Sequence, residues 1–326
     1  MIETSLHTLP HGITLSCRSA GTRGRPVLMF LHGFPEAAFV WDGLLEHFAK
    51  PENGGFRCIA PNLRGFERSS APPDAAAYRP RHLVQDIAAL AALETTQQSG
   101  QLACLVAHDW GGAVAWNVAA SQPQLMKQLA IINSPHPGTF LRELQQSPAQ
   151  QAASAYMNFL IRPDAEALLA ENDYRRLWEF FTHMGAENGP NPWLTETVKE
   201  QYRGVWRMGL TGPCNYYRAS PLRPPRPGPP HNDPAAAAVT IPREMLEVHL
   251  PTLVIWATDD IALPPALLEG LSDYVPQMQL QRVPGATHWI VHEQPDLVAA
   301  HLQQFLARNA IENIASYAHQ IRAEDP

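Results

Sequence analysis

A carboxylate stands at the tip of a turn in the segment 105–116, which reads LVAHDWGGAVAW. Small residues flank the centre of AHDWG (107–111), as a tight turn between a strand and a helix requires, because neighbouring backbones approach closely there. Such a turn lifts its central side chain to the C-terminal edge of a parallel sheet, where ligands bind in open α/β folds. Asp109, at the centre, is therefore a candidate nucleophile.

Two further polar residues come directly after apolar, strand-like runs. Asp260 ends PTLVIWATDD, and His288 lies in the turn PGATHW that follows MQLQRV. A nucleophile, then an acid, then a histidine is the chain order of a catalytic triad built on strand ends of one sheet. We expect all three side chains at the same edge. Asp259 is a neighbouring alternative for the acid, and the spacing from Trp256 favours Asp260.

An aspartate nucleophile predicts a different reaction from that of a serine. A serine must lose a proton before it attacks, whereas an aspartate, with a reference pKa near 3.9, is already ionised at neutral pH. Asp109 could therefore displace a leaving group at an sp³ carbon and form an ester on its own side chain. His288, held by Asp260, would then activate water against that ester. The expected substrate carries an epoxide or a halide.

The hydrolysis of such an ester needs donors for the developing oxyanion. One donor is expected from the backbone N–H of Trp110, directly after the nucleophile. The segment FLHGFPE (30–36), which follows an apolar strand, supplies the other at Phe34. A simple Gly-Phe-Pro turn is the alternative interpretation of that segment.

Composition limits the other functions. The chain has 326 residues, is 45% hydrophobic and 17% charged, and carries a net charge of −7 without a basic block, which argues against nucleic acid as a partner. No signal-like N-terminus and no apolar run of about 20 residues is present, so we expect a cytoplasmic protein that does not associate with membranes. The four cysteines lack metal-site spacing, and we expect free thiols, no metal, no cofactor and a small-molecule substrate.

The order of patterns predicts an α/β sheet interrupted by one helical segment. Apolar runs typical of buried strands alternate with helical patterns before and after that segment. The expected strands are 26–33, 56–61, 102–108, 128–135, 251–260 and 278–289, and the expected helices are 81–94, 149–160, 172–184 and 295–308. We expect a core of 1–137 and 244–326, with a helical cap at 138–243. Its Pro-rich stretch 220–238 is interpreted as a stiff connector in preference to a PxxP ligand.

The motifs HGFPE, HDWGG, NSPHPG and GATHW resemble the soluble epoxide hydrolase branch of the α/β-hydrolase superfamily, over nearly the whole chain. The resemblance implies the α/β-hydrolase fold, a mostly parallel sheet flanked by helices with an inserted helical cap, and conversion of an epoxide to a vicinal diol. It also implies two ring-opening tyrosines, matched by Tyr156 in SAYMNFL and Tyr217 in GPCNYYR. The chain departs from the family at Ala107 and Glu67, where glycine is common.

The resemblance further makes Trp110, Phe34 and Trp289 the expected walls of the substrate pocket. A haloalkane or haloacid dehalogenase is the alternative, with Trp110 binding the halide. Haloalkane dehalogenases usually have Asn where Phe34 stands, and haloacid relatives have Arg where Trp110 stands. A non-catalytic binding protein on the same fold is a third possibility, because fold does not determine function.

Overall fold

The computed structural model describes residues 1–97, 100–187, 192–226 and 233–308. Within these residues the chain forms one eight-stranded sheet in the order β1-β2-β4-β3-β5-β6-β7-β8. The strands are β1 (Glu3–Thr8), β2 (Thr14–Ala20), β3 (Val27–Leu31), β4 (Arg57–Pro61), β5 (Cys104–His108), β6 (Leu129–Ile132), β7 (Thr252–Ala257) and β8 (Met278–Val283). From β4 to β8 neighbouring strands run parallel, whereas β2 pairs antiparallel with both of its neighbours, β1 and β4. This is the α/β-hydrolase fold expected from the sequence.

The central strands are buried on both faces, and successive residues alternate between two hydrophobic clusters. In β3, Val27, Met29 and Leu31 face one cluster, while Leu28 and Phe30 face the other. This explains why the sequence shows continuous apolar runs instead of alternation. Edge strand β1 has no such run, because its residues are exposed or half-buried in alternation, and the sequence did not predict it.

Each expected strand is shorter than its apolar run. The run 128–135 ends as a strand at Ile132, and the run 278–289 ends at Val283. The remaining residues leave the sheet at its C-terminal edge but stay largely buried. The apolar runs therefore end in polar loops, and these loops carry Asn133, Ser134 and His288 to the site.

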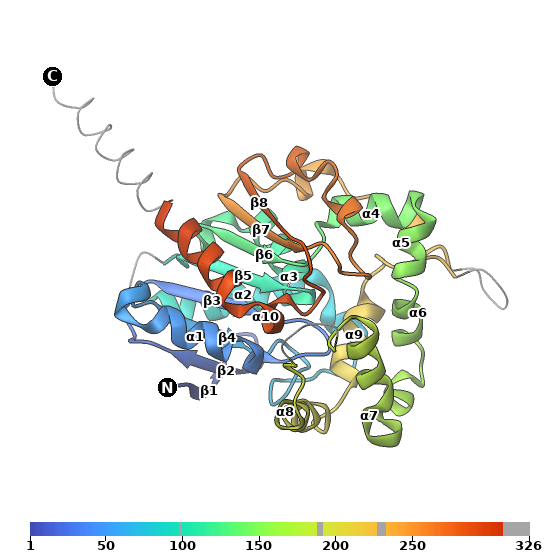
Figure 1. Cartoon of the computed structure of the whole chain (residues 1–326), viewed down its shortest axis with the longest axis horizontal. Coiled ribbons are helices and arrows are strands. Elements are labelled where there is room, and N and C mark those ends of the chain that lie inside the picture. The colour runs from blue at the N-terminus through green and yellow to red at the C-terminus, as the bar shows by residue number, and fades with distance from the viewer. Residues whose placement is uncertain (98–99, 188–191, 227–232, 309–326) are drawn as a thin grey trace.

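Helices cover both faces of the sheet, and a largely helical segment lies to one side of it in Figure 1. Residues 295–308 are also helical. The helices are α1 (Asp42–Ala49), α2 (Pro80–Thr95), α3 (Trp110–Ser121), α4 (Pro137–Gln146), α5 (Pro148–Ala153), α6 (Tyr156–Leu160), α7 (Ala165–His183), α8 (Glu196–Trp206), α9 (Thr211–Ala219) and α10 (Ile290–Glu293). We call the segment between β6 and β7, which carries α4–α9, the helical insertion.

Two expected helices of the helical insertion differ from those observed. The run 149–160 forms two short helices, α5 and α6. Both helices bury residues, among them Gln150 and Met157, so the helical spacing of buried positions continues in the sequence across the break. The run 172–184 lies within α7, where residues 171–174 are non-helical and three of them have positive φ. The expected boundaries of the cap lie close to the ends of observed elements. Residue 138 is the second residue of α4, and residue 243 begins a short turn before β7. Part of the Pro-rich stretch, 227–232, lies outside the described residues.

Glu67, one of the two departures from the family pattern, lies in a conformation that usually favours glycine. Its φ is +49°. The carboxylate accepts hydrogen bonds from the hydroxyl of Ser16, from the Asn62 amide at 3.3 Å and from the backbone N–H of Arg68 at 2.8 Å. These bonds hold the loop in place, so the loop accommodates a side chain that sterics would otherwise disfavour.

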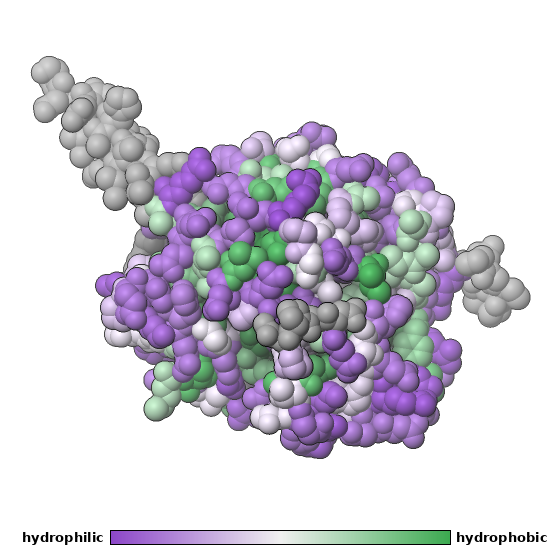
Figure 2. Space-filling model, in the orientation of Figure 1, coloured by the Kyte–Doolittle hydropathy of each residue, from purple (hydrophilic) through white to green (hydrophobic). Residues whose placement is uncertain are grey.

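The face in Figure 2 is mostly hydrophilic, with small scattered hydrophobic patches. Across the part of the chain that is described, helices are too short or too polar to cross a bilayer. The four cysteines, Cys17, Cys58, Cys104 and Cys214, are buried as free thiols.

Candidate active site

Asp109 lies in a strained turn between β5 and α3. Its φ and ψ are +49° and −125°, outside the regions that residues with a side chain usually adopt. The turn needs small residues around it: a Cβ atom at Gly111 would lie 2.4 Å from the carbonyl oxygen of Leu31, and one at Gly33 would lie 2.1 Å from Oδ1 of Asp109. The glycines therefore allow the carboxylate to reach the sheet edge.

The carboxylate of Asp109 faces a backbone donor on one side and an imidazole on the other. The N–H of Phe34 donates to Oδ1 at 2.6 Å, and Oδ2 lies 3.8 Å from Nε2 of His288. Trp110 is the first residue of α3, a position whose N–H has no acceptor within the helix. The hydroxyl of Ser134, just after β6, donates to the backbone carbonyl of Asp109 at 2.6 Å and holds the turn.

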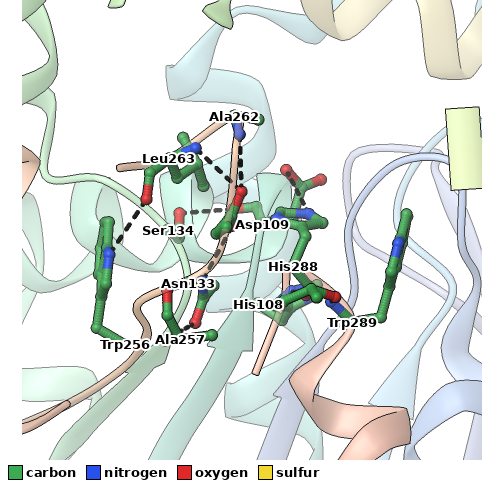
Figure 3. Close-up of polar contacts among 12 residues, drawn as sticks. His108, Asp109, Asn133, Ser134, Trp256, Ala257, Ala262, Leu263, His288 and Trp289 are labelled. Atoms are coloured by element: carbon green, nitrogen blue, oxygen red, sulfur yellow. Dashed lines mark hydrogen bonds and ion pairs between the residues drawn. The ribbon is translucent and has the colours of Figure 1, made fainter. Parts of the chain in front are cut away.

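His288 is bound to Asp260, and not to Asp259. Figure 3 shows His288 together with Asp109, Asn133 and Ser134 at the ends of the central strands. Nδ1–H of His288 donates to Oδ2 of Asp260 at 2.7 Å, and the two residues are 3% and 2% exposed. Asp259 is exposed and accepts a hydrogen bond from Thr258. Asn133 donates to Oδ2 of Asp260 at 3.0 Å, and the backbone N–H groups of residues 262 and 263 donate to Oδ1 at 2.9 and 3.0 Å. The acid is thus fully hydrogen-bonded.

The charges around His288 change its protonation. Burial by itself would lower the pKa of His288, but the negative charge of Asp260, their hydrogen bond and the charges of Asp109 and Glu36 outweigh it and raise the pKa to about 9. Burial would raise the pKa of Asp260, but His288 and the hydrogen bonds lower it below its usual value. In the free protein at neutral pH, an imidazolium therefore lies between two carboxylates.

Two tyrosines of the helical insertion lie over Asp109. Tyr156 begins α6 and Tyr217 lies in α9, with ring centroids 6.1 Å apart. The ring of Tyr217 packs edge-on against Trp110 and Phe34, at centroid distances of 5.1 and 5.2 Å. Burial, followed by neighbouring negative charge that includes Asp109, raises the pKa of both phenols. Both hydroxyls therefore stay protonated and can act as donors.

A cavity of about 240 Å³ opens beside Asp109, between the core sheet and the helical insertion. Asp109, Trp110 and Tyr156 line it, as do apolar residues of α3, α4 and the segment after α9. Trp110 thus lies where the sequence predicted a pocket wall. The candidate nucleophile and a candidate acid therefore line the same cavity.

Trp289 is not a wall of this cavity, although the sequence predicted it to bind substrate. It is 0% exposed, its indole N–H donates to the carbonyl of Phe181 at 3.1 Å, and its ring stacks on that of Phe181 at 4.3 Å. Phe34 is 2% exposed and also lies outside the cavity lining, although its N–H contacts Asp109. Adjacency in sequence to His288 therefore did not place Trp289 at the substrate, because the α7 side chains cover it.

Sequence reasoning missed a buried polar cluster behind His288. Glu36, at the end of HGFPE, accepts hydrogen bonds from Tyr202 at 2.8 Å and from His292 at 2.6 Å, and its other oxygen lies 3.5 Å from Nδ1 of His108. His108 contacts the backbone carbonyl of His288 at 2.9 Å. Burial would raise the pKa of Glu36, but the two histidines hold it well below its usual value. The motif HGFPE was the available signal for this residue.

Asn133 and Ser134 were also missed, although the motif NSPHPG contains them. Both lie in the loop after β6, and each holds a different member of the site, Asp260 and Asp109 respectively. Among the described residues no group of three or more histidine, cysteine, aspartate or glutamate side chains has the arrangement of a metal site.

Comparisons with known proteins identify the family to which the chain belongs. Residues 26–295 match the family described as the alpha/beta hydrolase fold. An AB hydrolase superfamily protein of Bacillus subtilis is 32% identical over 91% of this chain and 95% of its own, and human epoxide hydrolase 4 is 31% identical over 90% and 76%.

Solved structures agree. A structure described as novel epoxide hydrolases from metagenomes of hot environments has a TM-score of 0.79 and 38% identity, and covers 94% of this chain and 99% of its own. An epoxide hydrolase of Bacillus megaterium has a TM-score of 0.79 at 27% identity, over 93% and 100%. The chain therefore belongs to the α/β-hydrolase fold family and, within it, to the epoxide hydrolase branch.

Proposed function

We propose that the protein converts an epoxide to a vicinal diol through an ester on Asp109. Family membership supports the substrate class. The observation that carries the mechanism is the cavity lined by both the strained Asp109 and the half-buried Tyr156, with Tyr217 packed beside Tyr156. The helical insertion, taken as a cap over residues 138–243, would supply the acids, and the core would supply the nucleophile and the base.

In the first step, a carboxylate oxygen of Asp109 attacks a ring carbon and the carbon–oxygen bond of the epoxide breaks. The alkoxide takes a proton from Tyr156 or Tyr217, which becomes a tyrosinate, while the second phenol donates a hydrogen bond. A positioned acid of this kind contributes about 10²–10⁴-fold to a rate. The raised pKa of both phenols supports this role, because each keeps its proton until the alkoxide forms.

In the second step, His288 first releases its proton to solvent, because the neutral ester no longer holds the imidazolium charge. The neutral imidazole then takes a proton from water, and the water oxygen attacks the ester carbonyl carbon. Donors at Phe34 and Trp110 would stabilise the oxyanion. Collapse expels the alkyl oxygen, which takes the proton from His288 and leaves as the diol, and the proton remaining on Asp109 returns to the tyrosinate. Esterification removes the charge of Asp109, one of the causes that raise the pKa of His288, so the imidazole becomes a better base when the ester is present.

A dehalogenase is the second candidate, because Trp110 lines the cavity as a halide-binding indole would. A haloacid substrate is disfavoured, since no lysine, arginine or histidine is among the described residues that line the cavity, and nothing there would neutralise a substrate carboxylate next to Asp109.

The two reactions differ in their need for a phenol. An epoxide oxygen stays on the substrate and must be protonated, whereas a halide leaves as a weak base. In the variant Tyr156→Phe with Tyr217→Phe, formation of the Asp109 ester from an epoxide should slow by about 10²-fold or more, and ester formation from a bromoalkane should change little. Rapid-mixing measurement of ester formation tests this. Equal losses for both substrates, or no loss for epoxides, would contradict the proposal.

We further propose that the protein works in the cytoplasm on a small-molecule substrate. The four buried free thiols support a reducing compartment, where cysteines stay unpaired. Redox-state labelling of these cysteines in cells that produce the protein would test this.

A further inference from the structure

We propose that the protein selects epoxides that carry one apolar substituent on a single ring carbon, and rejects epoxides substituted on both carbons. The inference rests on the proposed function and names the substrate class of the same site. It comes from the shape and chemistry of the space around Asp109, which is open on one side and closed on the other.

The open side is the cavity along α3. From Asp109 it extends past Trp110 and Val114 to Phe140 of α4 and to Leu222, in the segment after α9. A substituent on one carbon of an epoxide held over Asp109 can extend into this space. Its volume of about 240 Å³ is below the roughly 300–1,000 Å³ of most small-molecule sites, which favours a small group such as one aromatic ring or a short alkyl chain.

The closed side is a connected set of rings. Phe34 contacts Phe180 of α7 at a centroid distance of 6.0 Å, and Phe180 contacts Tyr156 at 5.3 Å and Trp289 at 6.3 Å. Trp289 in turn contacts His288 at 5.1 Å. Phe34, Phe180, Trp289 and His288 all lie outside the cavity lining. A group on the second ring carbon would have to displace these rings or the histidine that activates water.

The chemistry of the cavity favours an apolar substituent, because most of its polar side chains already have hydrogen-bond partners within the protein. The hydroxyls of Tyr78 and Tyr216 donate to the backbone carbonyls of residues 72 and 64, at 3.0 and 2.9 Å. The hydroxyl of Ser134 donates to Asp109, and the amide of Asn117 donates to the carbonyl of residue 113 at 2.8 Å. With their donors committed to the backbone, these side chains present rings and methylene groups to the ligand.

The charge of the site leads to the same conclusion. Along the described residues of the lining, Asp109 is the charged side chain. The nearby cation, the imidazolium of His288, lies outside the lining and is already shared between Asp109 and Asp260, at 3.8 and 2.7 Å. An anionic substituent would be repelled by Asp109 and would lose its hydration without a partner. A terminal epoxide with an aryl or alkyl group is therefore the substrate that fits both the shape and the charge.

A matched pair of substrates tests the inference. Styrene oxide carries one phenyl group, and trans-β-methylstyrene oxide adds a methyl group on the second ring carbon. We expect kcat/KM for styrene oxide to be higher by about tenfold or more, the size of effect that one misplaced methyl group can have in a closed pocket. An anionic terminal epoxide, such as glycidate, should not be turned over.

Two variants test separately how the closed side and the open side of the cavity determine the substrate preference. Phe180→Ala, or Phe180→Leu if the alanine variant does not fold, should reduce the preference by about fivefold or more by opening the closed side. The control Phe159→Ala removes another ring of the helical insertion, one that lies outside the cavity lining, and should leave the preference unchanged. Val114→Phe should fill the open side and lower kcat/KM for styrene oxide more than for 1,2-epoxypropane.

The outcomes separate this inference from the proposed function. Equal or better turnover of the disubstituted epoxide by the unmodified protein would overturn the inference and leave the proposed function intact. An unchanged preference in the Phe180 variants would equally overturn the assignment of the closed side. Failure to turn over any epoxide, with no ester on Asp109, would instead contradict the proposed function.

Discussion

The core sheet and the helical insertion hold their active-site residues by different forces. In the core, Asp260 has hydrogen bonds with Asn133, His288 and two backbone N–H groups, and Asp109 is held by Phe34 and Ser134. In the helical insertion, the described contacts of the two tyrosines are mainly ring contacts with other aromatic residues. Hydrogen bonds are directional, whereas apolar contacts depend mainly on buried area.

This difference suggests a division of labour. The directional bonds of the core set the relative positions of nucleophile, base and acid, as covalent chemistry requires. A phenylalanine ring of the helical insertion, such as Phe180, can be replaced without breaking a side-chain hydrogen bond. Changes in the core should therefore affect every substrate alike, and changes in the helical insertion should depend on the substrate.

The largest effect is expected from Asp109→Ala. Loss of the nucleophile should reduce turnover of every epoxide by about 10⁴-fold or more, because later groups have no ester to act on. In the unmodified protein, a single turnover in H₂¹⁸O should place the label in Asp109, which mass spectrometry of the peptide detects. Label in the diol after the first turnover would show direct attack by water and contradict the ester mechanism.

Replacement of His288 by Gln should separate the two steps. Asp109 attacks without help from a base, so the ester still forms, while its hydrolysis should slow by about 10²–10⁴-fold. Intact-mass measurement should then show protein heavier by the mass of the substrate. The control is the double variant with Asp109→Ala, which should bind substrate without a mass increase. A His288→Gln protein that binds epoxide but gains no mass would show that the assignment of roles is wrong.

The pH dependence of the two steps should also differ. In the free protein, the charges of Asp260 and Asp109 outweigh burial and raise the pKa of His288 to about 9. The ester has no negative charge at Asp109, so its hydrolysis should accelerate with rising pH and level off with an apparent pKa below 9. NMR titration of His288 should give a lower pKa in Asp109→Ala than in the unmodified protein. An unchanged pKa would mean that the Asp109 charge has little influence on the imidazole.

The smallest effect on activity is expected from Trp289→Phe. The substitution removes the hydrogen bond to the buried carbonyl of Phe181 and should lower the free energy of unfolding by about 1–3 kcal/mol. Because Trp289 lies outside the cavity, KM should change by less than about twofold, in contrast with the Val114→Phe variant. Urea unfolding and steady-state kinetics measure the two quantities. A large rise in KM with unchanged stability would return Trp289 to the substrate pocket.

Much of the site was predictable because parallel strands end at one edge of a sheet. Asp109, Asp260 and His288 each follow an apolar run, and this alone indicated that they would meet. Local sequence was a poorer guide where a side chain could point in more than one direction. Trp289 follows His288 directly, yet its ring packs against Phe181, more than a hundred residues away in the chain.

The amino-acid sequence by itself therefore indicated the succession of strands from β3 to β8 along the chain, the tight turn at Asp109 and the candidate reacting groups, because these depend on periodicity and on residues close together in the chain. The tertiary structure alone decided that Glu36 joins His108, His292 and Tyr202 in a buried cluster, and that a cavity beside Asp109 is lined by residues of α3 and α4. The physical reason is that packing between distant segments depends on the shapes of all the side chains that meet there, and no local pattern records which of them will meet.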